Sequence, residues 1–415
     1  MHPLEPRLVV FTMVFPHAGQ PGTGLFVRER MFRVAKVLPL TVVAPVPWFP
    51  FQSLIRKWKP NFRPLAPSTE VQDGIEVRHP RFLSVPGSFK WLDGIFMALG
   101  SLPTMLRLKR SFGFNVIDAH FAYPDGYAAT LLGRWLHVPV TITLRGTEVP
   151  LSRDPPRRRR IVKALQRATR IFSVSDSLKR HVAGLGAPRD RILVVGNGVD
   201  TGTFHRIAKG NARKQLGLPA EARLLISVGA LVERKGFHRV MECLPALRQR
   251  CPDLRYLVVG GAGPEGDWGA ALRQRAADLG LQDCVIFLGA LAPDALKVPL
   301  SAADVFVLAT SNEGWANVFL EAMACGLPVV TTNVGGNAEV VSSPALGTLV
   351  PLGRKDELVS AISDALSRPW NRDSIVAYAQ QNSWDSRVEV LTAEFVELVA
   401  RQARTYAPGR VAGCD

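Results

Sequence analysis

The chain has 415 residues, a length that favours two domains over one compact core. Its formal net charge is +16, and the excess lies in residues 1–200, because acids and bases balance in the remainder. Such a basic half predicts an anionic partner: membrane lipid, a lipid-linked diphosphate, an acidic polysaccharide or nucleic acid. No nucleic-acid-binding motif accompanies the charge, so nucleic acid is the weakest of these partners.

The five cysteines, an odd number without metal-site spacing, argue against a disulfide framework and suit a reducing cytosol. The first residues, MHPLEPR, make a poor signal peptide because they include an acid and two prolines. No apolar run reaches the roughly 18–20 residues that span a bilayer. The longest candidate, residues 94–106, is short and contains Pro103. These features predict a cytoplasmic protein.

The chain opens with an apolar strand, predicted over residues 7–14, and a second strand follows over residues 40–45. Between them, a loop rich in glycine and proline leads into a helix. Gly19, Gly22 and Gly24 would let a ligand approach the backbone closely, although an ordinary turn explains them equally well.

Two segments of the basic half, residues 48–64 and 86–112, interleave aromatic and aliphatic residues with cations. This composition is typical of a segment at a membrane surface, where apolar side chains enter the lipid boundary and cations meet anionic headgroups. Alternatively, the domain core takes up the aromatic side chains Trp48, Phe51, Trp91 and Phe96.

Further strands are predicted over residues 116–120 and 139–144. His120 stands at the carboxyl end of the first, the edge where open α/β sheets bind ligands, although a structural histidine also fits there. Four arginines, residues 157–160, open a helix. They form either a solvated face or a site for an anionic acceptor or lipid.

Strands are also predicted over residues 170–175 and 191–195, and Ser175 is placed to cap the helix that follows the first. The segment GNGVDTGTF, residues 196–204, is rich in Gly and Asn and follows the second of these strands.

The second domain opens with a strand over residues 223–229, and the loop after it carries Arg234 and Lys235. Two adjacent cations in such a loop suit a diphosphate, whose charge must be neutralised as it leaves. The next strands are predicted over residues 255–263 and 284–290. The glycine loop that ends the first of these is weak evidence by itself.

Residues 304–339 predict a strand, a polar loop, a helix over 317–325, a strand and a second loop. A loop that opens a helix after a parallel strand is an anion site, because free amides and the helix dipole favour phosphate by roughly 0.3–2 kcal/mol. Glu313 precedes this site and Glu321 lies within the helix. Carboxylates beside phosphates need hydroxyl donors, such as those of a sugar or a ribose.

Helices are predicted over residues 355–367 and 386–404. Strands and helices alternate through both halves, and we find no tandem repeat of about 20–50 residues. The sequence therefore predicts an α/β fold of parallel sheets with helices on both faces.

Together these motifs resemble the family 4 retaining glycosyltransferases, which have the GT-B fold of two Rossmann-like domains facing across a cleft. The resemblance rests on E-x7-E within EGWANVFLEAMACGLPVV, on GGNAE after it, and on the NGVD–F pattern in residues 196–204. That last pattern ends the family's first domain, which implies one domain over residues 1–200 and a second over residues 201–385. Residues 26–30, FVRER, resemble a subgroup that builds surface polysaccharides, including the teichuronic acid biosynthesis glycosyltransferases. Trp384 and Asp385 resemble the family's closing element, which implies that the helix 386–404 packs back on the first domain.

The resemblance also implies roles for the candidate residues. Glu313 would contact the donor sugar, Glu321 the ribose, and Lys235 the diphosphate. His120 would face the phosphates and the sugar. Backbone positions would complete the donor site: Gly22, Gly24, Gly229, Gly261, Gly263, Ala316, Asn317 and Val318.

Two positions depart from the family's pattern. Ala230 stands where an arginine is common, and the sequence leaves open whether Arg234 replaces that cation. Glu148 stands where aspartate is commoner, and we expect it on the acceptor side.

The implied function is transfer of a hexosyl or N-acetylhexosaminyl unit, with retention, from a UDP- or GDP-sugar to a lipid-linked or polysaccharide acceptor in cell-surface polysaccharide biosynthesis. No Asp-x-Asp motif stands in a suitable place, so we expect no metal and no cofactor beyond the donor substrate. The expected location is the inner face of the bacterial plasma membrane, as a peripheral protein. Two alternatives stay open: a non-catalytic partner in a polysaccharide assembly complex, and a nucleotide-sugar epimerase.

Overall fold

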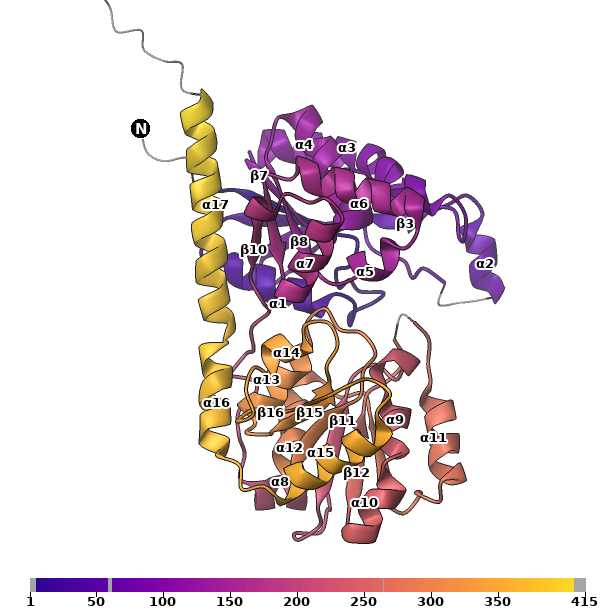
Figure 1. Cartoon of the computed structure of the whole chain (residues 1–415). Helices are drawn as coiled ribbons and strands as arrows, with labels where there is room; N and C mark the ends of the chain where they lie inside the picture. Colours follow the sequence, from indigo (N-terminus) through magenta and orange to yellow (C-terminus); the bar gives the residue numbers. More distant parts are fainter. Residues whose placement is uncertain (1–4, 59–61, 264, 407–415) are drawn as a thin grey trace, which may run out of the picture. The chain divides into compact units, whose positions relative to one another are not determined.

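The structure is a computed structural model that describes residues 5–58, 62–263 and 265–406. The chain divides into two compact units (Figure 1): the first runs to Gly196 and resumes at Arg387, and the second is Asn197–Ser386. Residues 59–61 of the basic aromatic segment, and Cys414, lie outside the described residues. The other four cysteines are free thiols.

An eight-stranded sheet in the order β10-β9-β8-β7-β1-β2-β5-β4 forms the centre of the first unit. Its pairs are parallel except at one edge, where two residues separate β4 from β5 and the chain turns back as a hairpin. The expected parallel sheet therefore carries one antiparallel edge strand. The strands are β1 (Leu8–Phe11), β2 (Leu40–Val43), β4 (Thr69–Gln72), β5 (Ile75–Arg78), β7 (Val116–His120), β8 (Val140–Leu144), β9 (Arg170–Ser173) and β10 (Ile192–Val194).

The first unit also contains helices and a small second sheet. The predicted cap is confirmed, since Ser175 Oγ accepts a hydrogen bond from the Leu178 amide at 3.2 Å. The small sheet pairs β3 (Val46–Trp48) with β6 (Arg81–Leu83). The helical elements are α1 (Leu25–Val34), α2 (Gln52–Trp58), η1 (Lys90–Leu92), α3 (Asp93–Ser111), η2 (Ala122–Gly126), α4 (Tyr127–Leu136), α5 (Glu148–Leu151), α6 (Pro155–Arg167), α7 (Asp176–Gly184) and η3 (Arg189–Arg191).

The last helix, α17 (Trp384–Tyr406), belongs to the first unit from Arg387 onward. Its apolar face enters the same core as β1 and α1, and the Phe395 ring meets Phe172 edge-on at 5.7 Å. In the described part of the chain, every helix is too short or too polar to cross a bilayer.

The second unit has six parallel strands in the order β13-β12-β11-β14-β15-β16. Both faces of this sheet are buried, because Ile226 and Phe306 enter one core while Leu225 and Val305 enter another. The strands are β11 (Leu224–Val228), β12 (Arg255–Val259), β13 (Val285–Gly289), β14 (Val305–Leu308), β15 (Val329–Thr332) and β16 (Gly347–Val350).

In the described part of this unit, ten helical elements accompany the strands. The order of the strands reverses between β11 and β14. Ligands of open α/β sheets bind beside the carboxyl ends of the strands at such a reversal. The elements are α8 (Lys209–Gln215), η4 (Glu233–Lys235), α9 (Phe237–Met241), α10 (Leu244–Arg250), α11 (Gly269–Asp278), α12 (Pro293–Ala302), α13 (Asn317–Ala324), α14 (Asn337–Val340), α15 (Lys355–Ser367) and α16 (Arg372–Gln381).

Candidate active site

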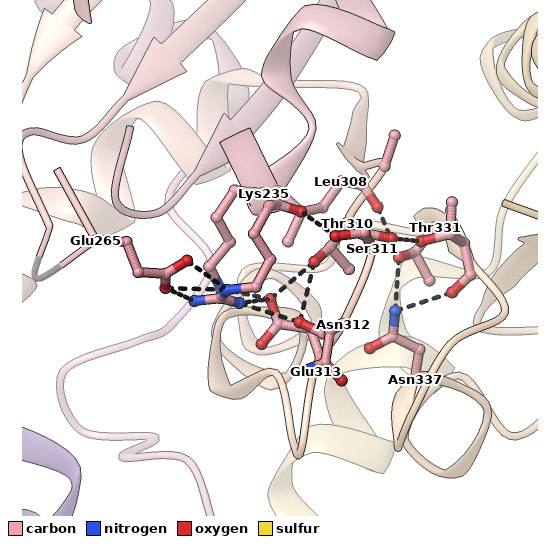
Figure 2. Close-up of polar contacts among 12 residues, drawn as sticks. Lys235, Glu265, Leu308, Thr310, Ser311, Asn312, Glu313, Thr331 and Asn337 are labelled. Atoms are coloured by element: carbon pink, nitrogen blue, oxygen red, sulfur yellow. Dashed lines mark hydrogen bonds and ion pairs between the residues drawn. The ribbon is translucent and has the colours of Figure 1, made fainter. Parts of the chain in front are cut away.

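The loops that follow β11 and β14 meet where the strand order of the second unit reverses. Lys235 comes from the first loop and Glu313 from the second, and Figure 2 shows their side chains pointing toward one another. Lys235 Nζ lies 2.6 Å from Glu313 Oε1. The same oxygen accepts a hydrogen bond from Thr310 Oγ1 at 3.2 Å, so a buried carboxylate is held by charge-assisted bonds.

Arg234 also contacts the Glu313 carboxylate. Its Nη1 lies 3.3 Å from Glu313 Oε1 and donates to the Asn312 carbonyl oxygen at 3.0 Å. Its Nε and Nη2 donate to the Glu265 carboxylate, with the shortest contact at 2.7 Å. Hydrogen bonding by this guanidinium lowers the pKa of Glu265. Both predicted phosphate-binding cations are therefore paired with carboxylates here.

Two glycines allow these loops to approach each other. At Gly335, φ is +54°, and a Cβ would lie 1.8 Å from the Glu313 carbonyl oxygen. At Gly236, φ is +73°, and a Cβ would lie 1.9 Å from the Ala309 carbonyl oxygen. Neither position has room for a side chain, so the glycines fix Glu313 and the Lys235 loop against β14.

The predicted glycine positions of this unit lie on the neighbouring loops. Gly229 ends β11 beside the Lys235 side chain, with 3.6 Å between its notional Cβ and Lys235 Cδ. The Gly261 carbonyl oxygen accepts from the Leu231 amide at 2.7 Å, and a Cβ at Gly263 would lie 2.8 Å from Ala230. The loops after β11 and β12 therefore lie side by side, next to Arg234 and Lys235.

The predicted anion site is the start of α13. Ala316 occupies the N-cap position and makes no side-chain hydrogen bond to the first turn, whose amides include those of Asn317 and Val318. Asn317 Oδ1 instead accepts a hydrogen bond from Asn197 Nδ2 at 2.8 Å. Helix N-termini of this kind attract phosphate.

Glu321 lies one turn further along α13 and is half-buried. Burial raises the pKa of Glu321 to about 7, while the nearby charge of Lys235 opposes the rise. At neutral pH this carboxyl group therefore titrates, and hydroxyl donors from a ligand would favour its ionised form.

The other predicted residue, His120, ends β7 in the first unit and is fully buried. Its Nδ1 lies 3.0 Å from Arg145 Nη2. Because a guanidinium can only donate, Nδ1 accepts and the proton of the neutral ring sits on Nε2. That nitrogen lies 3.3 Å from Asp118 Oδ2 but has no hydrogen-bond partner among the described residues. Burial lowers the pKa of His120 to about 4, so the ring is neutral at pH 7.

Both carboxylate oxygens of Glu148 accept hydrogen bonds from backbone amides. Its Oε1 accepts from the Ala122 amide at 2.9 Å and its Oε2 from the Gly146 amide at 2.8 Å. The carboxylate therefore holds together the loops that follow β7 and β8.

The two predicted glycines of the first loop differ from each other. Gly24 is the N-cap of α1 with φ of +74°, and a Cβ would lie 2.3 Å from the Val14 carbonyl oxygen. Gly22 has no atom near its notional Cβ. Packing therefore explains the first glycine but not the second.

Comparison of the sequence with known proteins shows which family the chain belongs to. A family model described as Glycosyl transferases group 1 matches residues 208–382, and one described as Glycosyltransferase Family 4 matches residues 47–203. The D-inositol 3-phosphate glycosyltransferase of Actinosynnema mirum is 30% identical over 355 residues, covering 80% of this chain and 84% of the relative. The chain belongs to glycosyltransferase family 4.

Two further comparisons extend over nearly the whole glycosyltransferase. A Bacillus subtilis protein, named provisionally as the teichuronic acid biosynthesis glycosyltransferase TuaC, is 28% identical and covers 94% of each chain. HepE from Anabaena, solved in complex with UDP, is 20% identical with a TM-score of 0.66, covering 96% of this chain and 98% of its own. The fold is the expected GT-B fold of two Rossmann-like domains.

Sequence reasoning missed two groups in this glycosyltransferase. Glu265, the partner of Arg234, stands in the loop after β12, where only a contact map would have linked it to residue 234. Arg30 on α1 is 0% exposed, and its three guanidinium nitrogens have no hydrogen-bond partner in the described part of the chain. Its position between Val27 and Met31 on the buried face was the available signal.

Proposed function

We propose that this glycosyltransferase transfers a hexosyl or N-acetylhexosaminyl unit from a UDP- or GDP-sugar, with retention, to a lipid-linked or polysaccharide acceptor in cell-surface polysaccharide biosynthesis. The observation that carries the proposal is the contact of Lys235 with Glu313, 2.6 Å apart, at the strand reversal of the second unit. The uncapped start of α13 lies four residues beyond Glu313. A cation, an acid and free amides suit a sugar diphosphate.

In this proposal the diphosphate lies on the first turn of α13 and draws Lys235 and Arg234 from their carboxylate partners. The anomeric C–O bond to the diphosphate breaks, and the acceptor oxygen forms its bond on the same face of the sugar. The acceptor's proton passes to the leaving diphosphate oxygen. Lys235, Arg234 and the helix amides stabilise the charge that develops.

Three side chains would orient the substrates. Glu313 accepts hydrogen bonds from sugar hydroxyls and Glu321 from ribose hydroxyls. His120 donates from Nε2, the nitrogen that also faces Asp118 Oδ2 at 3.3 Å. We propose that no metal takes part, so excess EDTA should leave the rate unchanged.

Calorimetry tests the diphosphate contact. Lys235→Ala should weaken UDP or GDP binding by at least tenfold and leave binding of the matching nucleoside within about twofold, since one charge-assisted hydrogen bond contributes about 1.5–3 kcal/mol. Lys214→Ala, which removes an exposed lysine from α8, is the matched control. Equal weakening of nucleotide and nucleoside would refute the phosphate role.

We also propose that the first unit binds an anionic membrane surface. Aromatic side chains on and before α2 are open to solvent, with Phe51 75% and Trp58 88% exposed. Trp91 is 40% exposed beside the arginines of α6, and Arg160 stacks on its ring at 5.2 Å. The alternative that Phe51 and Trp91 fill the core is wrong, since they lie at the surface. Exposed aromatic residues among cations favour an anionic lipid interface.

Vesicle sedimentation tests this surface. Trp58→Ser should reduce binding to phosphatidylglycerol vesicles several-fold, whereas Trp135→Ser, which removes a 44% exposed tryptophan from α4, should not. Loss of binding in both variants, or in neither, would contradict the assignment.

A further inference from the structure

A cavity of about 880 Å³ lies in the first unit, at the edge of the sheet opposite His120. Its lining includes Val140 and Arg170, which begin β8 and β9, and Arg191, which directly precedes β10. His120 instead ends β7, and the strands are parallel, so a strand length of about 15 Å separates the two edges. The cavity is therefore distinct from the candidate active site.

The α17 helix forms one wall of the cavity, and Figure 1 shows this helix running beside the strands of the first unit. Arginine is the commonest charged residue in the lining. The arginines are Arg134, Arg167, Arg170, Arg191 and Arg401, and the acids are Asp190, Glu394 and Glu397.

Both acids that α17 contributes to the lining, Glu394 and Glu397, have cationic partners. Arg170 binds Glu394 through two nitrogens, at 2.7 Å and 3.0 Å. Arg401 binds Glu397 at 2.6 Å. Among the described residues of the lining, Asp190 is then the remaining acid, against Arg134, Arg167 and Arg191, so the lining keeps an excess of positive charge.

One of these cations is poorly satisfied. Arg167 Nη1 is shielded from solvent and has no hydrogen-bond partner among the described residues. Arg191 Nη1 already donates to the backbone oxygens of Gln166 and Ala168, beside Arg167 at the end of α6. A buried guanidinium nitrogen without an acceptor is destabilising, and Arg167 would gain an acceptor if its side chain turned toward an anion bound in the cavity.

Helix dipoles explain part of this charge. Arg134 and Arg167 stand in the last turns of α4 and α6, where cations offset the partial negative charge of the helix end. That effect needs only an exposed cation near the last carbonyls. It does not account for a shielded nitrogen without a partner, or for a cavity beside it.

We propose that this cavity is a second binding site, for a small anion that carries two or more phosphate groups. Its volume is in the range of small-molecule sites, and the planar fork of arginine matches phosphate oxygens. The lining holds no Phe, Tyr or Trp, so the site recognises the phosphate chain and not an aromatic base. A neighbouring cavity of about 410 Å³ shares His137, Val138 and Gln402 with it and adds Lys109, which gives a chain room to extend.

Calorimetry with inorganic tripolyphosphate and the full chain tests the site. The donor site could also bind this probe, so the titration is run in the Lys235→Ala background. We expect binding there to weaken at least tenfold when Arg134→Gln and Arg167→Gln are combined. Arg81→Gln, which removes an exposed arginine from β6 of the same unit, should change it by less than twofold. ATP should bind no more tightly than tripolyphosphate.

Several results would overturn the proposal. One is the absence of tripolyphosphate binding at about 1 mM in the Lys235→Ala background. Another is equal weakening by Arg81→Gln, which would indicate general attraction to a basic surface. Binding of ATP more than tenfold tighter than tripolyphosphate would show that a base is recognised. Thermal melting of each variant without ligand checks that the fold is kept.

Discussion

Glu321 is half-buried on α13, and burial raises its pKa to about 7. In our account the ribose hydroxyls bind its ionised form, so the bound state favours loss of the proton. Affinity for a nucleotide sugar should therefore increase as the pH rises, by about tenfold between pH 6 and pH 8. Glu321→Gln should bind weakly and without this pH dependence.

Calorimetry at both pH values measures the effect. A nucleotide sugar is the right ligand, because its diphosphate has no free terminal phosphate that titrates in this range. The same pH dependence in the wild type and in Glu321→Gln would exclude Glu321 as its source.

Arg30 offers a second test at the scale of one residue. Its buried guanidinium lacks hydrogen-bond partners among the described residues, and burial lowers the pKa of Arg30 to about 10. Replacing a poorly paired buried charge with an apolar side chain often stabilises a protein, so Arg30→Met should raise the free energy of unfolding by about 1–3 kcal/mol. Urea denaturation measures this, with Arg30→Lys as the charge-preserving control. A loss of stability in Arg30→Met would show that Arg30 is satisfied by contacts in solution.

At this scale the sequence proposes which residues form the site, and the structure adds which side chains contact one another. Lys235 and Glu313 follow adjacent strands, so a common edge could be expected, but their 2.6 Å contact depends on how two glycine-limited loops approach. Glu265 could not be predicted, because nothing local ties the β12 loop to Arg234. The two hydrogen bonds that fix Glu148 also depend on tertiary packing.

Among the elements, the loop after β15 supports the active site directly. Gly335→Ala would place a Cβ 1.8 Å from the Glu313 carbonyl oxygen and would force the two loops apart. Transfer should fall at least tenfold, because Glu313 would move away from Lys235. Gly353→Ala is a matched control, since that glycine also has positive φ, +85°, but no atom within 4 Å of its notional Cβ.

Initial rates and melting temperatures of the two variants separate these effects. Both variants share the backbone strain of a left-handed alanine, about 1–2 kcal/mol, so only the steric clash distinguishes them. Equal loss of activity in both variants would show that strain, and not the position of Glu313, controls the rate.

The elements themselves were largely predictable. Buried parallel strands are continuous apolar runs, so the predicted 116–120 coincides with β7, and the predicted 139–144 exceeds β8 by one residue. The hairpin of β4 and β5 was not predicted, because each strand has four residues and β4, TEVQ, contains a single apolar side chain. Short elements such as β16 and α14 are defined by tertiary pairing, which local sequence does not encode.

For the whole molecule, composition indicated a basic half, and the structure adds how that charge is distributed. Some of it surrounds exposed aromatic residues near α2 and α6, and some lines the cavity beside α17. These two surfaces call for different ligands, a lipid headgroup layer and a small polyphosphate. Net charge alone could not separate them.

The most direct test of the account is to measure nucleoside diphosphate release from a panel of UDP- and GDP-sugars by phosphorus NMR, with acceptor extract and EDTA present. We predict that one donor releases its nucleoside diphosphate in step with glycan formation, with the anomeric configuration kept, and that Glu313→Ala and Lys235→Ala reduce the release at least a hundredfold. Release that requires a divalent metal, or a sugar that isomerises while its diphosphate stays attached, would contradict it.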